Sequence, residues 1–128
     1  MLALLVAGLA ACGGSSAATP AAIEIGTTGG NIIPTKAVLE ADGHVQGSVL
    51  SMRGHGPPRH LLPESTVLSF DRQVGAAFAA GLASRQCPGV LPDFASAYIA
   101  FKGKTVTVHG NCEPRFSALW NKLADATG

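Results

Sequence analysis

The strongest constraint on the fold is the segment FASAYIAFKGKTVTVHG, residues 94–110, in which apolar and polar residues alternate on both sides of Lys102-Gly103. A two-residue turn at Lys102-Gly103 places Ile99 opposite Val106. One face is then apolar, and the other carries serine, tyrosine and threonine side chains. Because the turn and both alternations agree on one register, the segment predicts a β-hairpin with one buried face.

A second hairpin is predicted in KAVLEADGHVQGSVL, residues 36–50. A three-residue loop, Ala41-Asp42-Gly43, fits best, because glycine adopts the left-handed conformation that such a loop needs. This loop sets Leu39 opposite Val45 on the apolar face. A further strand at Ala22–Gly26 precedes it, so four to five strands are expected.

Two helices complete the predicted elements. The first should begin at Ser69 as its N-cap and end near Gln86, and the second should carry Pro114 in its first turn. Their apolar stripes have helical spacing. The residues in these stripes are Phe70, Val74, Phe78 and Leu82, and then Phe116, Leu119, Trp120 and Leu123. Each stripe favours a core face, with Trp120 alternatively an exposed anchor for a partner.

The order of these elements is strand, hairpin, helix, hairpin, helix. It predicts an α+β domain with two helices on an antiparallel sheet of four to five strands, in the order β-ββ-α-ββ-α. The 128 residues suffice for one small domain, and an apolar share of 47% with 13% charged residues excludes a disordered chain. The net charge of +1 makes nucleic acid an unexpected partner.

The amino terminus, MLALLVAGLAAC, resembles a bacterial lipoprotein signal, although no Lys or Arg precedes its apolar run. The resemblance implies that residues 1–11 are removed and that Cys12 receives a diacylglycerol. Residues 12–21 then form a Gly/Ser-rich tether and residues 22–128 the folded domain. We therefore expect a lipid-anchored protein of the bacterial cell envelope, outside the cytoplasm. The alternative is a buried helix with an ordinary core cysteine.

With Cys12 assigned to lipid, Cys87 and Cys112 remain as an even pair in an exported chain. Extending the register of the 94–110 hairpin brings Cys112 to a short loop from Cys87. We therefore predict a disulfide. A free thiol pair or a metal site is the alternative, but the chain lacks further Cys or His at the short intervals typical of zinc sites.

A Gly29-Gly30 pair interrupts IEIGTTGGNIIP, residues 23–34. Such a pair can cradle a phosphate, redirect a strand or allow another backbone to approach closely. A phosphate loop would need a following Lys and helix, which are missing here. A bulge and a binding contact both remain open.

A second candidate contact is the Gly/Pro-rich segment SMRGHGPPRHLLPES, residues 51–65. It carries Arg53, His55, Arg59 and His60. The two histidines are weak metal ligands, because no third ligand is fixed nearby. The segment is either a basic loop without a specific role or a contact loop on a rigid scaffold.

Catalytic motifs are missing from the sequence. The carboxylates are spread one per element, and no nucleophile elbow or zinc-protease motif occurs. His109 faces Ser96 across the predicted hairpin, but no third group is evident to orient the pair. We expect no enzymatic activity, no metal and no cofactor.

The segment IEIGTTGGNIIP, a later hairpin strand ending in GKTVTV and a proline-started helix containing SALW together resemble the emfourin family over residues 22–125. Emfourins are small bacterial inhibitors of thermolysin-like metalloproteases. The resemblance implies that Gly29, Gly30, Asn31, Ile32 and Ile33 lie at or near a protease-contacting region. The lipid signal, the cysteine pair and the lack of aromatic residues after Gly30 depart from that pattern. CPGV, GKTV and NCE give a weaker resemblance to subtilisin-inhibitor-like proteins.

The sequence thus predicts an exported, lipid-tethered domain that binds another protein, most simply a secreted protease, by surface complementarity. The contact would use Gly29–Pro34, assisted by Arg53–His60. The alternative is a structural or sensory envelope lipoprotein whose sheet binds a cell-wall component or a membrane partner.

Overall fold

Both predicted hairpins form in the registers that their turns favour. The computed structural model describes residues 20–50 and 60–128. Within it, Ile99 pairs with Val106 and Leu39 with Val45, which confirms both registers. The elements are β1 (Ile23–Thr28), β2 (Thr35–Leu39), β3 (Val45–Ser48), α1 (Glu64–Ala79), β4 (Arg85–Gln86), β5 (Ser96–Phe101), β6 (Lys104–His109) and α2 (Pro114–Thr127).

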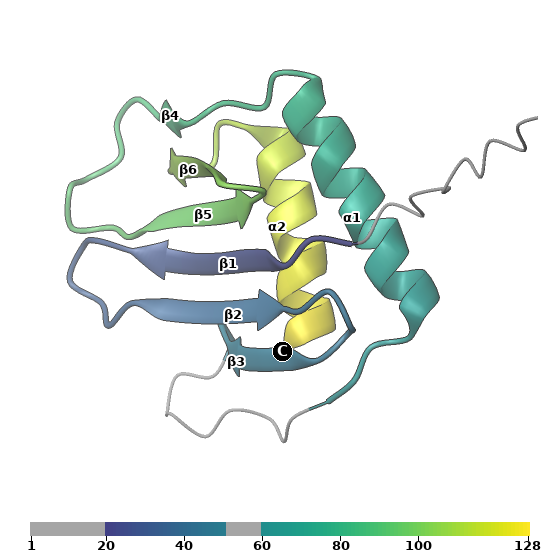
Figure 1. The fold of residues 1–128 in the computed structure, drawn as a ribbon. Helices are drawn as coiled ribbons and strands as arrows, with labels where there is room; N and C mark the ends of the chain where they lie inside the picture. The colour runs from purple at the N-terminus through teal and green to yellow at the C-terminus, as the bar shows by residue number, and fades with distance from the viewer. Residues whose placement is uncertain (1–19, 51–59) are drawn as a thin grey trace, which may run out of the picture.

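The strands build one sheet in the order β3-β2-β1-β5-β6-β4 (Figure 1). β1 lies in the middle and pairs antiparallel with both β2 and β5. The α+β class is confirmed, but the sheet has six strands and is mixed, because β4 runs parallel to β6. The expectation of a purely antiparallel sheet of four to five strands is therefore wrong at this edge. A two-residue strand is too short to leave a periodic signal in the sequence.

The first helix begins and ends earlier than expected. α1 starts after Pro63 rather than at Ser69, and the amides of Thr66 and Val67 both donate to the Pro63 carbonyl. It ends at Ala79, because Gly81 adopts a left-handed conformation with φ of 88° and closes the helix with a Schellman motif. The expected helix end at Gln86 is thus replaced by a connection and by β4.

Both helices cover the same face of the sheet (Figure 1). The alternating strand residues that point to this face form one core with the helix stripes. Its most completely buried large side chains are Ile23, Ile25, Leu39, Leu82, Ile99, Leu123, Val74, Val106 and Val108. The opposite face carries no helix and presents polar side chains between half-buried apolar ones, as antiparallel sheets with one solvated face do.

The second helix agrees with its sequence signals. Pro114 occupies its first turn, and Phe116, Leu119 and Leu123 are buried. Trp120 packs partly buried against the core, which favours the core interpretation over the exposed anchor. Within residues 20–50 and 60–128, neither helix has the length and apolar composition needed to cross a membrane.

Candidate functional site

Two loops meet at the end of the sheet where β1 ends and β5 begins. The β1–β2 loop, residues 29–34, and the β4–β5 loop, residues 87–95, lie next to each other at the left of Figure 1. The Asn31 amide donates a hydrogen bond of 3.0 Å to the Asp93 carbonyl. We call the exposed apolar side chains of these loops, Ile32, Ile33, Leu91 and Phe94, the two-loop surface.

Gly30 makes this contact between the loops possible. It has a left-handed φ of 64°, and a Cβ at this position would come within 2.4 Å of the Asp93 carbonyl oxygen. A larger residue would push the loops apart. The double glycine therefore does allow close backbone approach, but the approaching backbone belongs to the chain's own second loop.

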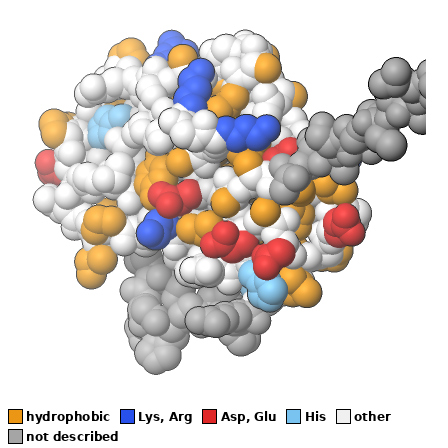
Figure 2. Space-filling view, in the orientation of Figure 1, with side chains coloured by type: hydrophobic (Ala, Val, Ile, Leu, Met, Phe, Trp, Pro, Cys, Tyr) orange, Lys and Arg blue, Asp and Glu red, His pale blue; other side chains and the backbone are white. Residues whose placement is uncertain are grey.

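The four side chains of the two-loop surface are large and apolar, yet each is exposed to solvent. Ile32, Ile33, Leu91 and Phe94 expose 49%, 86%, 59% and 61% of their surface, and they make up four of the seven exposed large hydrophobic residues in the described part of the chain. Figure 2 shows hydrophobic side chains at separate points along its left edge, where Figure 1 draws the two loops. Such clusters on one surface typically mark an interaction site.

The second loop forms a tight turn rather than an extended segment. The Phe94 amide donates to the Leu91 carbonyl at 3.1 Å, which closes a β-turn with Pro92 and Asp93 at its centre. Proline at the first central position fixes the backbone in the conformation that such a turn uses. Leu91 and Phe94 thus stand at the base of one turn and project from it.

His109 ties this turn to the sheet. Its Nε2 lies 3.1 Å from the Leu91 carbonyl oxygen, and its Nδ1 lies 3.0 Å from Ser96 Oγ. Because a carbonyl can only accept, the contact with Leu91 requires a proton on Nε2, and in that tautomer Nδ1 accepts from the Ser96 hydroxyl. The pairing of Ser96 with His109 was expected, and the third group that orients the ring is a backbone carbonyl. The arrangement holds the loop in place.

The Cys87–Cys112 disulfide is confirmed, with the two Cα atoms 5.6 Å apart. It joins the first residue of the β4–β5 loop to the segment between β6 and α2, and the Cys87 amide also donates to the His109 carbonyl at 2.8 Å. Gly110 lies against the bridge with φ of 107°, where a Cβ would come within 2.7 Å of the Cys87 Cβ. The bridge therefore fixes the start of the loop at the edge of the sheet.

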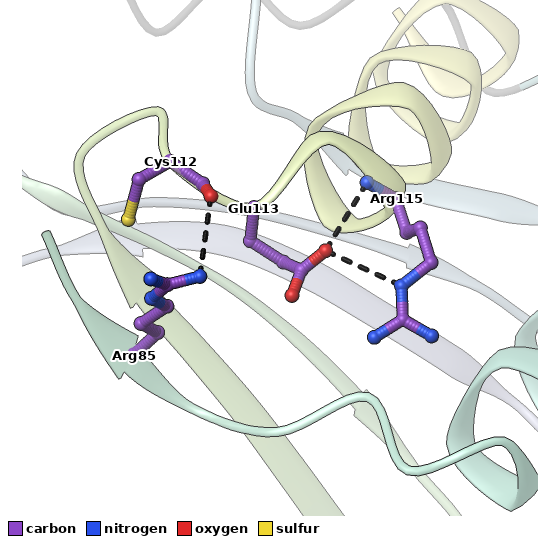
Figure 3. A network of polar contacts seen from close by, with 4 residues as sticks. All are labelled: Arg85, Cys112, Glu113 and Arg115. Atoms are coloured by element: carbon purple, nitrogen blue, oxygen red, sulfur yellow. Dashed lines mark hydrogen bonds and ion pairs between the residues drawn. The ribbon is translucent and has the colours of Figure 1, made fainter.

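Polar contacts continue from the bridge to the start of α2 (Figure 3). The Arg85 guanidinium donates to the Cys112 carbonyl at 3.4 Å. The Glu113 carboxylate caps the helix by accepting from the Arg115 amide and from its guanidinium, each at 3.3 Å. These exposed contacts are individually weak. They nevertheless connect β4 with the segment that leads from the disulfide into the helix.

Tyr98 lies on the open face of the sheet, beside Glu24 of β1. Its hydroxyl donates to Glu24 Oε2 at 2.8 Å, and its ring covers Gly26. Partial burial, followed by the hydrogen bond to the Glu24 carboxylate and the charge of that group, raises the pKa of Tyr98 to about 12. The neutral phenol is therefore the form that the fold stabilises.

Of the predicted contact residues beyond Gly29–Pro34, the structure describes only His60, and His60 does not lie at the two-loop surface. His60 lies near the start of β3, where its carbonyl accepts from Val45 and its Nε2 lies 3.1 Å from the Ala126 carbonyl. This is the far end of β2 from Gly29–Pro34. The predicted residues Cys12, Arg53, His55 and Arg59 lie outside the described residues.

Leu91 and Phe94 were missed by the sequence argument. The sequence argument placed Phe94 at the start of the 94–110 hairpin, whereas β5 begins at Ser96 and leaves Phe94 in the preceding turn. Leu91 next to Pro92 was the signal available in the sequence, because proline favours a turn. No group of three or more His, Cys, Asp or Glu side chains within residues 20–50 and 60–128 could hold a metal ion. Comparison with protein-family models, with curated proteins and with solved structures found no match.

Removing the disulfide should loosen the whole domain. In the chain-entropy description, a closed loop of this length contributes about 3 to 4 kcal/mol to the free energy of unfolding. We expect the Cys87→Ser/Cys112→Ser variant to lose about that amount in urea denaturation. Wild-type protein treated with reductant should match the variant, and reductant should leave the variant unchanged. Equal midpoints for the variant and the oxidised wild type would contradict this role.

Tyr98 is the chain's single tyrosine, so its titration can be followed directly. A pKa raised from 10.0 to about 12 means that its contribution to stability is complete below pH 10 and is lost as the pH rises to 12. Phenolate absorbance should show a midpoint near 12, with circular dichroism reporting whether the fold persists. In Glu24→Gln the acceptor loses its charge, and the midpoint should move toward 10. An unchanged midpoint in that variant would exclude Glu24 as a cause.

Proposed function

We propose that this chain is a protein-binding domain that acts through the two-loop surface, and that its partner is a secreted protease whose cleft this surface occupies. The observation that carries the proposal is the presence of four exposed apolar side chains on two loops that the fold fixes against each other. Preformed loops bind with little loss of conformational freedom. A projecting apolar surface also suits a concave partner.

The charges on the loops favour a protein over a lipid surface. Segments 29–34 and 88–95 contain a single charged side chain, Asp93, and no Lys or Arg. Surfaces that insert into membranes usually combine apolar tips with basic residues that attract anionic lipids. An acidic residue between Leu91 and Phe94 opposes such insertion.

The emfourin resemblance supports the choice of a protease. It implies that Gly29, Gly30, Asn31, Ile32 and Ile33 lie at or near a protease-contacting region. Of these residues, Ile32 and Ile33 belong to the two-loop surface. Inhibition would follow from occupying the substrate cleft, without any chemistry carried out by the domain itself. Arg53–His60 would not assist this contact through His60, which lies at the far end of β2.

A lipid on Cys12 would hold the surface away from its membrane. The described chain enters the fold at the start of β1, where the Ala21 amide donates to Asp71 Oδ1 at 3.0 Å. The two-loop surface lies beyond the opposite end of this six-residue strand, about 20 Å away. A tether at one end and a binding surface at the other would leave the surface free to meet a secreted partner.

Titration of the purified chain against thermolysin-like and subtilisin-like proteases tests the function. We expect loss of proteolysis with at least one of them, because the apolar surface would block its cleft. Phe94→Ala and Ile33→Ala should each weaken inhibition about tenfold or more, as truncation of buried interface anchors does. Leu68→Ala serves as the control, since Leu68 is an exposed apolar residue on α1. Full proteolysis in the presence of an excess of folded protein would reject the protease proposal.

The anchor has a separate test. Cys12→Ser removes the only thiol that the signal resemblance assigns to lipid, so the protein should move from the membrane fraction to the soluble fraction. Fractionation of cells that express each form measures this. Cys112→Ser is the matched control and should stay with the membrane. A Cys12→Ser protein that remains fully membrane-bound would show that lipid on this cysteine is not what holds it.

A further inference from the structure

Three backbone groups of the Leu91–Phe94 turn make hydrogen bonds within the chain. The Leu91 carbonyl accepts from both the Phe94 amide and His109 Nε2, and the Asp93 carbonyl accepts from the Asn31 amide. Pro92 has no amide proton to donate. The carbonyls of Leu91 and Asp93 and the amide of Phe94 are therefore already hydrogen-bonded within the chain before a partner binds.

A substrate-like contact requires the opposite arrangement. Chains that add to a partner as a strand are extended and leave alternate amides and carbonyls free along one edge. The Leu91–Phe94 turn cannot extend without breaking three hydrogen bonds, those from Phe94, from His109 and from Asn31. The disulfide at Cys87 further restricts the loop from its other end.

The two edges of the sheet are also protected against strand addition. At β3, the Val45 amide donates to the His60 carbonyl, and Gly47 leaves the extended conformation with φ of 75°. At the other edge, the two-residue strand β4 covers the last residues of β6, and the Thr107 amide of β6 donates to Ser84 Oγ. Native sheets use such short, interrupted edges to prevent pairing with other chains.

From these observations we propose that the two-loop surface engages its partner through its apolar side chains, with the Leu91–Phe94 turn kept closed and seated in an apolar hollow of the partner protein. This inference rests on the proposed protein-binding function and adds the mode of contact. The partner does not bind the loop as an extended substrate. The loop stays a closed turn in the complex and is not cleaved there. The partner must then offer a hollow lined by apolar groups.

Limited proteolysis of the full chain by thermolysin and by subtilisin, with cut sites mapped by mass spectrometry, tests this inference. We expect no early cleavage within 88–95 in the wild type, because the turn must open before it fits a protease cleft. His109→Phe removes one of the three hydrogen bonds and leaves the Leu91 carbonyl with one partner fewer. Cleavage within 90–94 should then become about five- to tenfold faster, since it follows the population of the opened loop.

His44→Phe is the matched control. His44 is an exposed histidine on the β2–β3 turn whose Nδ1 pairs with Asp42 at 2.9 Å, far from the loop contact, so its replacement should leave the 88–95 cleavage rate unchanged. Amide hydrogen exchange of the wild type provides a measurement that needs no variant. The Asn31 and Phe94 amides should be protected, because both donate within the two-loop contact.

Early cleavage of the wild type inside 91–94, or rapid exchange at both amides, would overturn the closed turn and favour a substrate-like contact. Binding to vesicles of phosphatidylcholine and phosphatidylglycerol that is lost in Phe94→Ala would overturn the choice of a protein hollow. A protease that is inhibited while the loop stays uncut, with loss of inhibition in Phe94→Ala, supports the inference. If no protease is inhibited but the turn is resistant and protected, the protease proposal fails while the closed turn stands.

Discussion

The antiparallel pairing of β1 with β5 is the interaction on which the rest of the structure depends. It joins two hairpins that are local in sequence into one sheet, with Ile23 paired to Phe101 at one end and Thr28 to Ser96 at the other. Because β1 ends where β5 begins, the loop that follows β1 and the loop that precedes β5 must lie together. The two-loop surface is therefore a direct consequence of this pairing, although its halves are about sixty residues apart in the chain.

The edge of the sheet beyond β6 shows how a small domain holds a segment with little core of its own. β4 has two residues, and both are exposed. A small domain buries a limited share of its surface, so covalent links contribute much of the order at such places. Here the disulfide, the Gly110 contact and the His109 hydrogen bonds fix the β4–β5 loop where apolar burial is slight.

The apolar residues that stabilise the core are different from those that form the proposed binding surface. Ile25, Ile99 and Val106 lie under the helices and are fully buried, whereas Ile32, Ile33, Leu91 and Phe94 face solvent. Exposed apolar side chains on fixed loops add nothing to the core and increase the risk of association. Their presence on two loops that hydrogen bonds hold against each other fits the proposed surface for a partner, bound through these side chains.

The sequence by itself determined the α+β class, both hairpin registers, the second helix and the cysteine pair, because each depends on local periodicity, turn chemistry or simple counting. It misplaced the first helix, since Pro63 and Gly81 rather than Ser69 and Gln86 set its ends. It also missed β4, whose pairing with β6 is long-range. The sequence indicated that Gly29 and Gly30 allow a bulge or a close backbone approach. Only the tertiary structure decided that Gly30 faces the chain's own Asp93, and that Leu91 and Phe94 lie on the same surface. The physical reason is that contacts between distant loops are set by strand pairing, which no local pattern records.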